Sequence, residues 1–175
     1  NAEMGLIVFD SCDNSNDIES GGIRLLQDFT TDKSALKGKI SSLSPYGDTP
    51  IADALSEAEN YLKSTKGQGT LILITDGEET CGGDPVLVAG GIKSKNIGKV
   101  HVVGYLIGGS AEEKAKEIAV AGGGKYYGVK NIDELENALT SITQQGGNPF
   151  GGCCAVTFGF ILALFGVLKM NGKIV

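Results

Sequence analysis

The chain has 175 residues, which is enough for one domain with a buried core. Its formal net charge of −6 argues against a nucleic-acid partner, because an acidic surface cannot neutralise phosphates. The single histidine disfavours a Ser-His or Cys-His catalytic pair and a zinc site built on imidazole.

Apolar runs alternate with amphipathic segments along most of the chain. Residues 4–9 predict a buried strand, residues 10–22 a polar loop, and residues 23–27 a short antiparallel edge strand. Asp32 is placed to cap the first helix. That helix carries apolar residues at helical spacing, namely Leu36, Ile40 and Leu43.

A loop over residues 45–50 precedes a strong helix signal. Thr49 is a good N-cap, and Pro50 suits the first helical position. One apolar face follows at helical spacing, made by Ile51, Ala54, Leu55, Ala58 and Leu62.

The run Leu71-Ile-Leu-Ile74 is typical of a strand buried on both faces of a parallel sheet. Thr75 and Asp76 follow it directly. A hydroxyl and a carboxylate are thereby placed at the carboxyl end of the strand, the edge where open α/β sheets bind ligands.

The remaining segments continue the alternation. A helix is expected from about 85 to 95, a central strand over 99–107, and a helix after the capping box Ser110–Glu113. A short strand lies within 122–128, and Asn131–Glu134 opens a last helix in capping-box style. The pattern predicts an α/β fold, with a doubly wound, mostly parallel sheet and helices on both faces.

The end of the chain differs in composition from the rest, because residues 146–168 carry no charge. A bilayer core about 30 Å thick needs roughly 20 apolar residues in a helix. We expect the domain to cover residues 1–145 and a glycine-rich linker to cover 146–152. A transmembrane helix is expected over 153–168, with a span that can begin near 149. A buried core helix is the alternative, disfavoured because the run has no polar face.

Lys169 and Lys173 follow this span, whereas the segment before it is uncharged. The positive-inside rule then places a tail at 169–175 in the cytoplasm and the domain outside the cell membrane. Small residues recur at every fourth position of the span, at Ala155, Gly159 and Ala163. This stripe could pack another helix or form a lipid-facing groove.

Two oxygen-bearing side chains indicate a cation site, Asp76 at a strand end and Thr49 at a helix start. Magnesium is commonly bound through one or two carboxylates and several waters. Each residue also has a purely structural interpretation. Thr49 can cap its helix, and Asp76 can form an Asx-turn with Gly77.

Three motifs in succession resemble the von Willebrand factor type A domain over residues 2 to about 145. They are Gly5-Leu-Ile-Val-Phe9, Gly47-Asp-Thr-Pro-Ile51 and Leu71-Ile-Leu-Ile-Thr-Asp-Gly77. Segments 75–85 and 100–104 are similar to those of bacterial secreted or membrane-anchored members. The resemblance implies a Rossmann-like sheet with strand order 3-2-1-4-5-6 and a metal-ion-dependent adhesion site made by three loops.

Thr49 matches the second-loop ligand of that family and Asp76 the third-loop ligand. The first loop, Asp-x-Ser-x-Ser, has no match, because Asp10–Ser15 lacks the paired serines. The fold is therefore expected to lack its first strand and helix, with a gap at the sheet centre between the strands at Leu6 and Leu71. With only two ligands, Mg²⁺ binding is expected to be weak or absent.

Cys12 and Cys81 each follow the carboxyl end of a predicted strand. Both should lie on the same edge of the sheet, and a location outside the cytoplasm permits oxidation. We therefore expect a disulfide between them, with two separate loop thiols as the alternative.

No nucleophile–base pair is visible, and Glu78 and Glu79 are interpreted as solvated loop acids, so no enzyme is expected. The resemblance favours a membrane-anchored binding module whose protein partner supplies an Asp or Glu to the cation. The alternative is an accessory subunit of a membrane complex, chelatase-like or channel-associated, that acts through its transmembrane helix. A hydrolase or transferase on a Rossmann-like sheet is disfavoured by the lack of a catalytic constellation.

Overall fold

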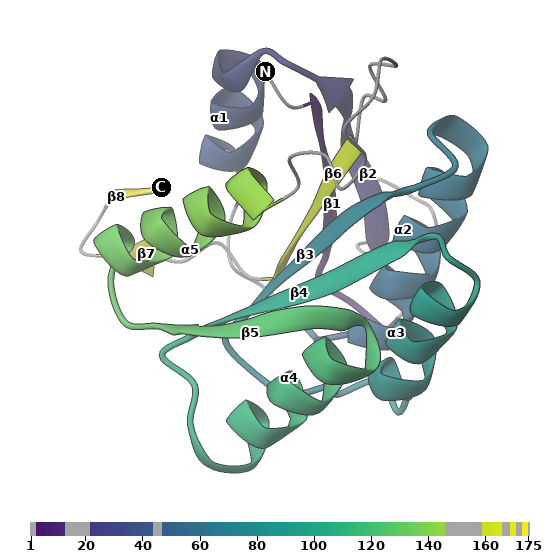
Figure 1. The fold of residues 1–175 in the computed structure, drawn as a ribbon. Helices are drawn as coiled ribbons and strands as arrows, with labels where there is room; N and C mark the ends of the chain where they lie inside the picture. Colours follow the sequence, from purple (N-terminus) through teal and green to yellow (C-terminus); the bar gives the residue numbers. More distant parts are fainter. Residues whose placement is uncertain are drawn as a thin grey trace.

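The computed structural model describes residues 3–12, 22–43 and 47–145, together with three strands near the C-terminus. A sheet crosses the middle of the molecule, with helices on both of its faces (Figure 1). Its strands are β1 (Glu3–Phe9), β2 (Ile23–Thr30), β3 (Gly69–Thr75), β4 (Gly98–Tyr105), β5 (Gly123–Val129) and β6 (Gly159–Phe165). The helices are α1 (Lys33–Ser41), α2 (Ile51–Thr65), α3 (Pro85–Ser94), α4 (Gly109–Ala121) and α5 (Ile132–Gln145).

The strand order of the sheet is β2-β1-β6-β3-β4-β5. The β1–β2 pair is antiparallel, and the other neighbours in the sheet are parallel. The doubly wound, mostly parallel sheet and its antiparallel edge strand are thus confirmed. The order is also the one that the family resemblance implies, with β6 in the place of the family's first strand.

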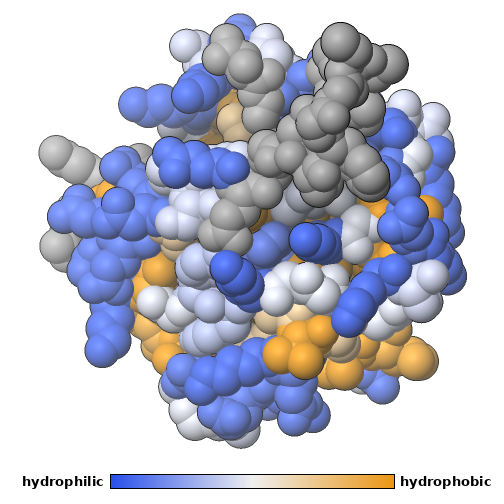
Figure 2. All heavy atoms as spheres, in the orientation of Figure 1, coloured by the Kyte–Doolittle hydropathy of each residue, from blue (hydrophilic) through white to orange (hydrophobic). Residues whose placement is uncertain are grey.

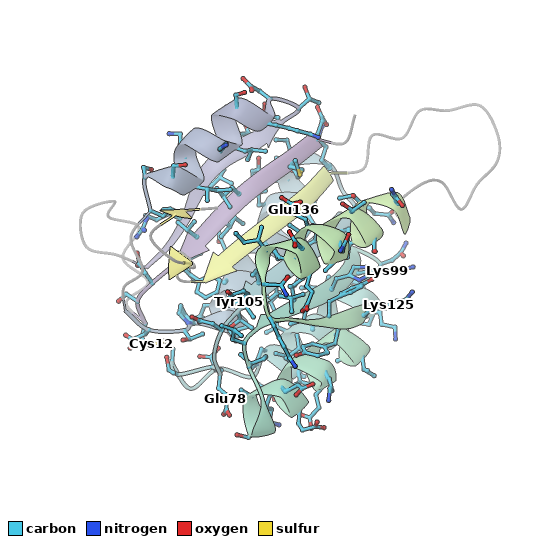
Figure 3. The ribbon with its side chains drawn as sticks, turned by 90° about the vertical axis from the view of Figure 1, so that its left-hand side faces the viewer. Cys12, Glu78, Lys99, Tyr105, Lys125 and Glu136 are labelled. Atoms are coloured by element: carbon cyan, nitrogen blue, oxygen red, sulfur yellow. A yellow bond between two sulfur atoms is a disulfide. The ribbon has the colours of Figure 1, made fainter. Side chains whose placement is uncertain are left out.

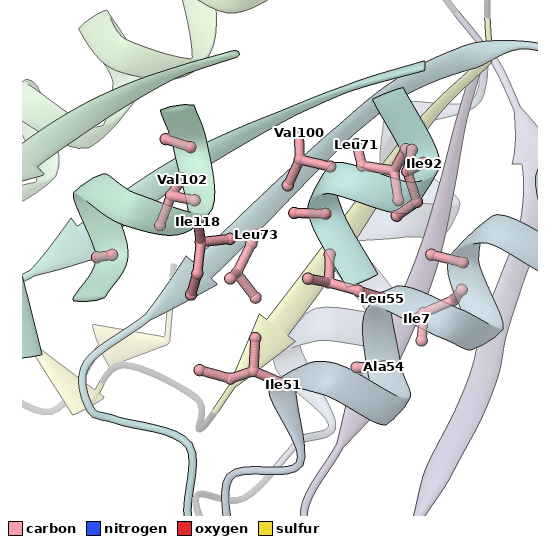
Figure 4. Close-up of a cluster of buried hydrophobic side chains, with 14 of the residues drawn as sticks. Ile7, Ile51, Ala54, Leu55, Leu71, Leu73, Ile92, Val100, Val102 and Ile118 are labelled. Carbon is pink, nitrogen blue, oxygen red and sulfur yellow. The ribbon is translucent and has the colours of Figure 1, made fainter. Parts of the chain in front are cut away.

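The core lies in two layers, one on each face of the sheet. Helices α2, α3 and α4 cover one face, where Leu71 and Leu73 pack with Ile51 and Leu55 (Figures 1 and 4). Helix α5 covers part of the other face and packs on Ile72 and Ile74. Leu36 of α1 packs on β1 on that same side. Because successive strand residues point to opposite faces, the uniformly apolar run of β3 is buried on both.

Residues 159–165, which lie within the transmembrane helix expected over 153–168, form strand β6 instead. This strand pairs in parallel with β1 and β3, and Ile161 lies opposite both Gly5 and Leu71. An uncharged run suits the centre of a sheet as well as a bilayer, and β6 supplies partners for backbone groups that β1 and β3 would otherwise leave unpaired. The gap predicted at the sheet centre is thus occupied by a segment of this same chain.

Other expectations for this end change accordingly. Gly159 and Ala163 belong to β6, so they form no helical stripe, and Ala155 and the linker at 146–152 lie outside the described residues. Within the expected tail, β7 (Lys169–Met170) pairs antiparallel with β8 (Lys173–Ile174). Within the described part of the chain, no helix has the length and apolar character that crossing a membrane requires.

Hydrophilic side chains cover much of the surface seen in Figure 2, with apolar patches between them. The large apolar side chains that stay exposed among the described residues are Leu25, Leu87, Leu106 and Val120. They come from β2, α3, the residue after β4 and α4, so they do not form the face of one surface helix.

Candidate functional site

Three loops meet at the carboxyl edge of the sheet, namely residues 10–12 after β1, residues 47–50 before α2 and residues 76–84 after β3. The Asp48 amide donates to the Asp10 carbonyl at 2.8 Å, which joins the first loop to the second. The Thr80 amide donates to the Thr49 carbonyl at 3.1 Å, which joins the second to the third. Figure 3 shows Cys12 and Glu78 at this edge, toward which the arrows of β1 and β6 point.

Thr49 is buried in the second loop, where its amide donates to the Thr80 hydroxyl at 2.7 Å. The expectation that Thr49 is the N-cap is wrong by one residue, because α2 begins at Ile51 and Pro50 takes the cap position. Pro50 has a non-helical ψ of 65° and a side chain that cannot cap. The Thr49 hydroxyl has no hydrogen-bond partner among the residues that the structure describes.

Glu79 of the third loop supplies the cap that α2 lacks. One carboxylate oxygen accepts from the Ala52 amide at 2.8 Å, and the other accepts from the Cys81 amide at 2.7 Å. A negative charge at this position also interacts favourably with the helix N-terminus. Glu79 is therefore a structural clamp and not a solvated loop acid. No local sequence motif predicts this role of Glu79, because the helix residue that it contacts lies 27 residues away.

Glu78 turns away from this clamp and accepts a hydrogen bond from the Ser110 hydroxyl at 2.6 Å. The capping box expected at Ser110–Glu113 is absent, because α4 begins at Gly109 without a side-chain cap. Ser110 thus joins the third loop to α4.

Asp76 follows Thr75 at the end of β3 and is exposed. The turn with Gly77 is made by the Thr75 hydroxyl, which accepts from the Gly77 amide at 3.2 Å and donates to the Gly77 carbonyl at 3.0 Å. Partial desolvation raises the pKa of the Asp76 carboxyl, and its own backbone amide offsets this only in part. Within the described ranges no other group pairs with this carboxylate, so it is free to bind a ligand.

Asp10, the acidic residue of the unmatched first loop, is already engaged. Its carboxylate accepts two hydrogen bonds from Arg24, at 2.7 and 3.2 Å, and one from the Gly22 amide at 2.8 Å. Gly47 packs on its backbone so closely that a Cβ would lie 1.6 Å from the Asp10 carbonyl oxygen. Gly47 also has a φ of +96°, so glycine is required there and the second loop is fixed against β1.

Cys12 and Cys81 form a disulfide between the first and third loops, with a Cα–Cα distance of 5.2 Å. The Asp48 carboxylate lies beside them and accepts from the Cys12 amide at 3.4 Å. One potential ligand atom from each of these three residues lies within 4.8 Å of the others. In the disulfide state the sulfurs are bonded to each other and are not thiolate ligands.

Comparison with known proteins decides the family. The family model described as von Willebrand factor type A domain matches residues 12–145. This chain belongs to that family.

The von Willebrand factor type A domain found here has relatives in Bacillus subtilis (strain 168). The uncharacterized protein YwmD is 38% identical over 115 residues, which cover 64% of this chain and 51% of YwmD. The uncharacterized protein YwmC is 36% identical over 103 residues, which cover 58% of this chain and 45% of YwmC. The chain thus spans about half the length of these curated relatives.

Among solved structures, the conserved hypothetical protein BatB from Bacteroides thetaiotaomicron matches with a TM-score of 0.61 and 24% identity. The match covers 82% of this chain and 78% of BatB. It shows a shared fold.

The candidate ligand atoms of this von Willebrand factor type A domain are of the type that a hard divalent cation prefers. The Thr49 hydroxyl and the Asp76 carboxylate are both oxygen donors, the type that Mg²⁺ prefers. Asp10 does not add a third donor, because Arg24 holds its carboxylate. Two protein oxygens are thus available at this edge of the sheet, and waters would complete the coordination of an ion held there.

Proposed function

We propose that this protein is a binding module that recognises a protein partner through a divalent cation held by Thr49 and Asp76. One observation carries the proposal. Among the residues that the structure describes, the Asp76 carboxylate, whose pKa is raised, and the Thr49 hydroxyl have no hydrogen-bond partner, and both lie at the same edge of the sheet of a von Willebrand factor type A domain. An ion with few protein ligands keeps positions that a partner's Asp or Glu side chain can fill.

The charge of this edge supports recognition through a cation. Segments 47–50 and 76–84 contain no lysine or arginine, and their acidic residues are Asp48, Asp76, Glu78, Glu79 and Asp84. Direct contact with an acidic partner would therefore be repulsive, and a bridging cation removes that repulsion. The labelled lysines of β4 and β5, Lys99 and Lys125, lie on the opposite side of the molecule in Figure 3.

The proposal places the domain outside the cytoplasm. The disulfide between Cys12 and Cys81 supports this location, because disulfides persist in oxidising compartments and are rare in the cytosol.

The proposal also assigns no catalysis to the domain. Within the described structure, His101 and Ser110 do not pair with each other as base and nucleophile. His101 accepts from the Lys125 amide at 3.2 Å, and Ser110 donates to Glu78. The alternative role as an accessory subunit acting through a transmembrane helix is not favoured, because residues 159–165 form β6.

Calorimetric titration of Mg²⁺ into the full chain tests the cation site. We expect a weak dissociation constant, on the order of 10⁻⁴–10⁻³ M, the range of Ca²⁺ in extracellular modules. Asp76→Asn removes the charged donor and should abolish the binding heat. Glu78→Gln is the matched control, because it removes an exposed carboxylate of the same loop and should leave the heat unchanged.

Two results would contradict the proposal. One is equal heat from the Asp76→Asn variant and the parent, which would place the ion elsewhere. The other is the absence of any heat from the parent at millimolar Mg²⁺. Micromolar affinity would instead contradict the expectation of weak binding by two protein donors.

A further inference from the structure

We propose that Cys12, Asp48 and Cys81 form a binding site for a thiophilic divalent cation such as Zn²⁺, and that this site exists only when the disulfide is reduced. The three side chains come from the three different loops at the carboxyl edge of the sheet. Their potential ligand atoms already lie within 4.8 Å of one another. The donor set of two sulfurs and one carboxylate differs from the all-oxygen pair of Thr49 and Asp76, so the inference stands independently of the proposed function.

Reduction of the disulfide opens the site. A dithiol reductant gives two electrons and two protons to the Cys12–Cys81 bond, which breaks into two thiols, while the dithiol closes to its own disulfide. Zn²⁺ then displaces one proton from each thiol. Two thiolates and the Asp48 carboxylate supply three ligands, and water takes the fourth tetrahedral position.

The loops are held together by contacts that do not depend on the disulfide. The Asp48 amide donates a hydrogen bond to the Asp10 carbonyl, and the Cys81 amide donates one to the Glu79 carboxylate at 2.7 Å. Glu79 is itself fixed to the start of α2. The cysteines should therefore stay close after reduction. Cys12 and Asp48 are exposed, so an ion can enter from solvent.

With the proposed site, the first and third loops are linked to each other in both redox states. In the oxidised protein the S–S bond joins the first and third loops, and neither sulfur is a thiolate that can coordinate a metal. In the reduced protein the bound ion joins the same two loops and adds the second loop through Asp48.

Titration with Co²⁺, a spectroscopic substitute for Zn²⁺, tests the proposal. The full chain carries Cys153→Ser and Cys154→Ser, so that only the Cys12–Cys81 pair can supply thiolates. The reduced protein should bind one Co²⁺ with a thiolate-to-metal charge-transfer band, which Zn²⁺ then removes by displacement. The oxidised protein should show no such band. Zn²⁺ should raise the Tm of the reduced protein and leave that of the oxidised protein unchanged.

Three further variants make the test specific. Asp48→Asn should weaken the reduced site at least about tenfold, since even the loss of an outer-shell partner costs that much. Glu78→Gln, the control carboxylate, should have no effect. Cys12→Ser with Cys81→Ser lacks the covalent bond as the reduced protein does, but has no thiolates, and should lose the band completely.

The proposal is overturned by a reduced, folded protein without the charge-transfer band, or by Asp48→Asn binding as tightly as its parent. Circular dichroism establishes whether the reduced protein is folded. A reduced protein that is unfolded and that Zn²⁺ does not refold would overturn the proposal equally.

Discussion

At the scale of single residues, Glu79 is the side chain that most directly holds the candidate site together. Glu79→Gln keeps the shape of the side chain but removes the charge that faces the Ala52 and Cys81 amides. We expect the free energy of unfolding to fall by about 1 kcal/mol, as for the loss of a helix cap. Urea unfolding at neutral pH measures this loss.

The neighbouring Glu78→Gln is the control for that measurement. Glu78 is exposed and interacts with one hydroxyl, so its change should stay within about 0.5 kcal/mol. Equal losses for the two variants would show that Glu79 does not act as a cap.

His101 is buried in β4 at an irregularity in the pairing with β5. The register shifts between Val100 and Val102, and the imidazole Nδ1 accepts from the Lys125 amide at 3.2 Å. The side chain thus replaces a backbone acceptor. Burial lowers the pKa of His101, and the positive charges of Lys99 and Lys125 lower it further.

Stability should consequently fall in mildly acidic solution. Below about pH 6.5, the ordinary pKa of histidine, His101 binds a proton in the unfolded chain but stays neutral in the folded protein, because its folded pKa is lower. The stabilising contribution is complete above that pH and is lost as the pH drops toward the folded pKa. His101→Gln keeps an acceptor but does not titrate, so its unfolding free energy should decline less steeply. Parallel pH profiles for the two proteins would contradict this assignment.

Residue patterns were reliable only where the partner is local. At the start of α5 the Glu134 amide donates to the Asn131 side chain at 2.9 Å, as the capping pattern predicts. The similar pattern at Ser110–Glu113 forms no cap, because α4 begins at Gly109, and the Ser110 hydroxyl donates to Glu78 from another loop. Two similar local patterns thus have different outcomes, and the residue at which each helix begins distinguishes them.

At the scale of elements, β6 is the strand whose pairing most affects the sheet. Ala163 lies opposite Ile7 of β1 and Leu73 of β3, within both pairings. Ala163→Pro removes an amide and restricts the backbone of a central strand, so we expect a loss of about 3 kcal/mol or more. Denaturant unfolding, with hydrogen exchange of the β1 and β3 amides, measures the effect.

Ala163→Gly retains the amide and is the matched control, with an expected loss of about 1 kcal/mol. A proline variant as stable as the glycine variant would contradict the central position of β6. Hydropathy could not have placed this strand, because a bilayer and a two-sided sheet core both select uncharged apolar runs.

At the scale of the whole molecule, the disulfide constrains a large part of the chain. Cys12 and Cys81 are 69 residues apart, and closing a loop of that length lowers the entropy of the unfolded chain. The chain-entropy model gives a stabilisation of about 4 kcal/mol. Reduction in metal-free buffer should therefore lower the Tm clearly and retard migration on a denaturing gel.

The Cys153→Ser, Cys154→Ser protein is the control and should respond to reduction as the parent does. An unchanged Tm and an unchanged mobility after reduction would show that Cys12 and Cys81 are free thiols in solution.

The sequence by itself determined the helices and strands up to residue 145 and the edge of the sheet at which they place polar side chains. The two-sided burial of Leu71–Ile74 follows from its uniform apolar composition. Parallel strands end at one edge of a sheet, so the chain positions of Cys12, Thr49, Asp76 and Cys81 were enough to bring them to the same end of the molecule.

Only the tertiary structure decided which groups meet at that edge and what fills the centre of the sheet. Arg24 engages Asp10, Glu79 caps α2 from 27 residues away, and residues 159–165 enter between β1 and β3. The physical reason is common to all three. Local patterns specify how much of a segment is buried, whereas pairing depends on contacts between distant segments that become favourable only when the rest of the fold holds both partners in place.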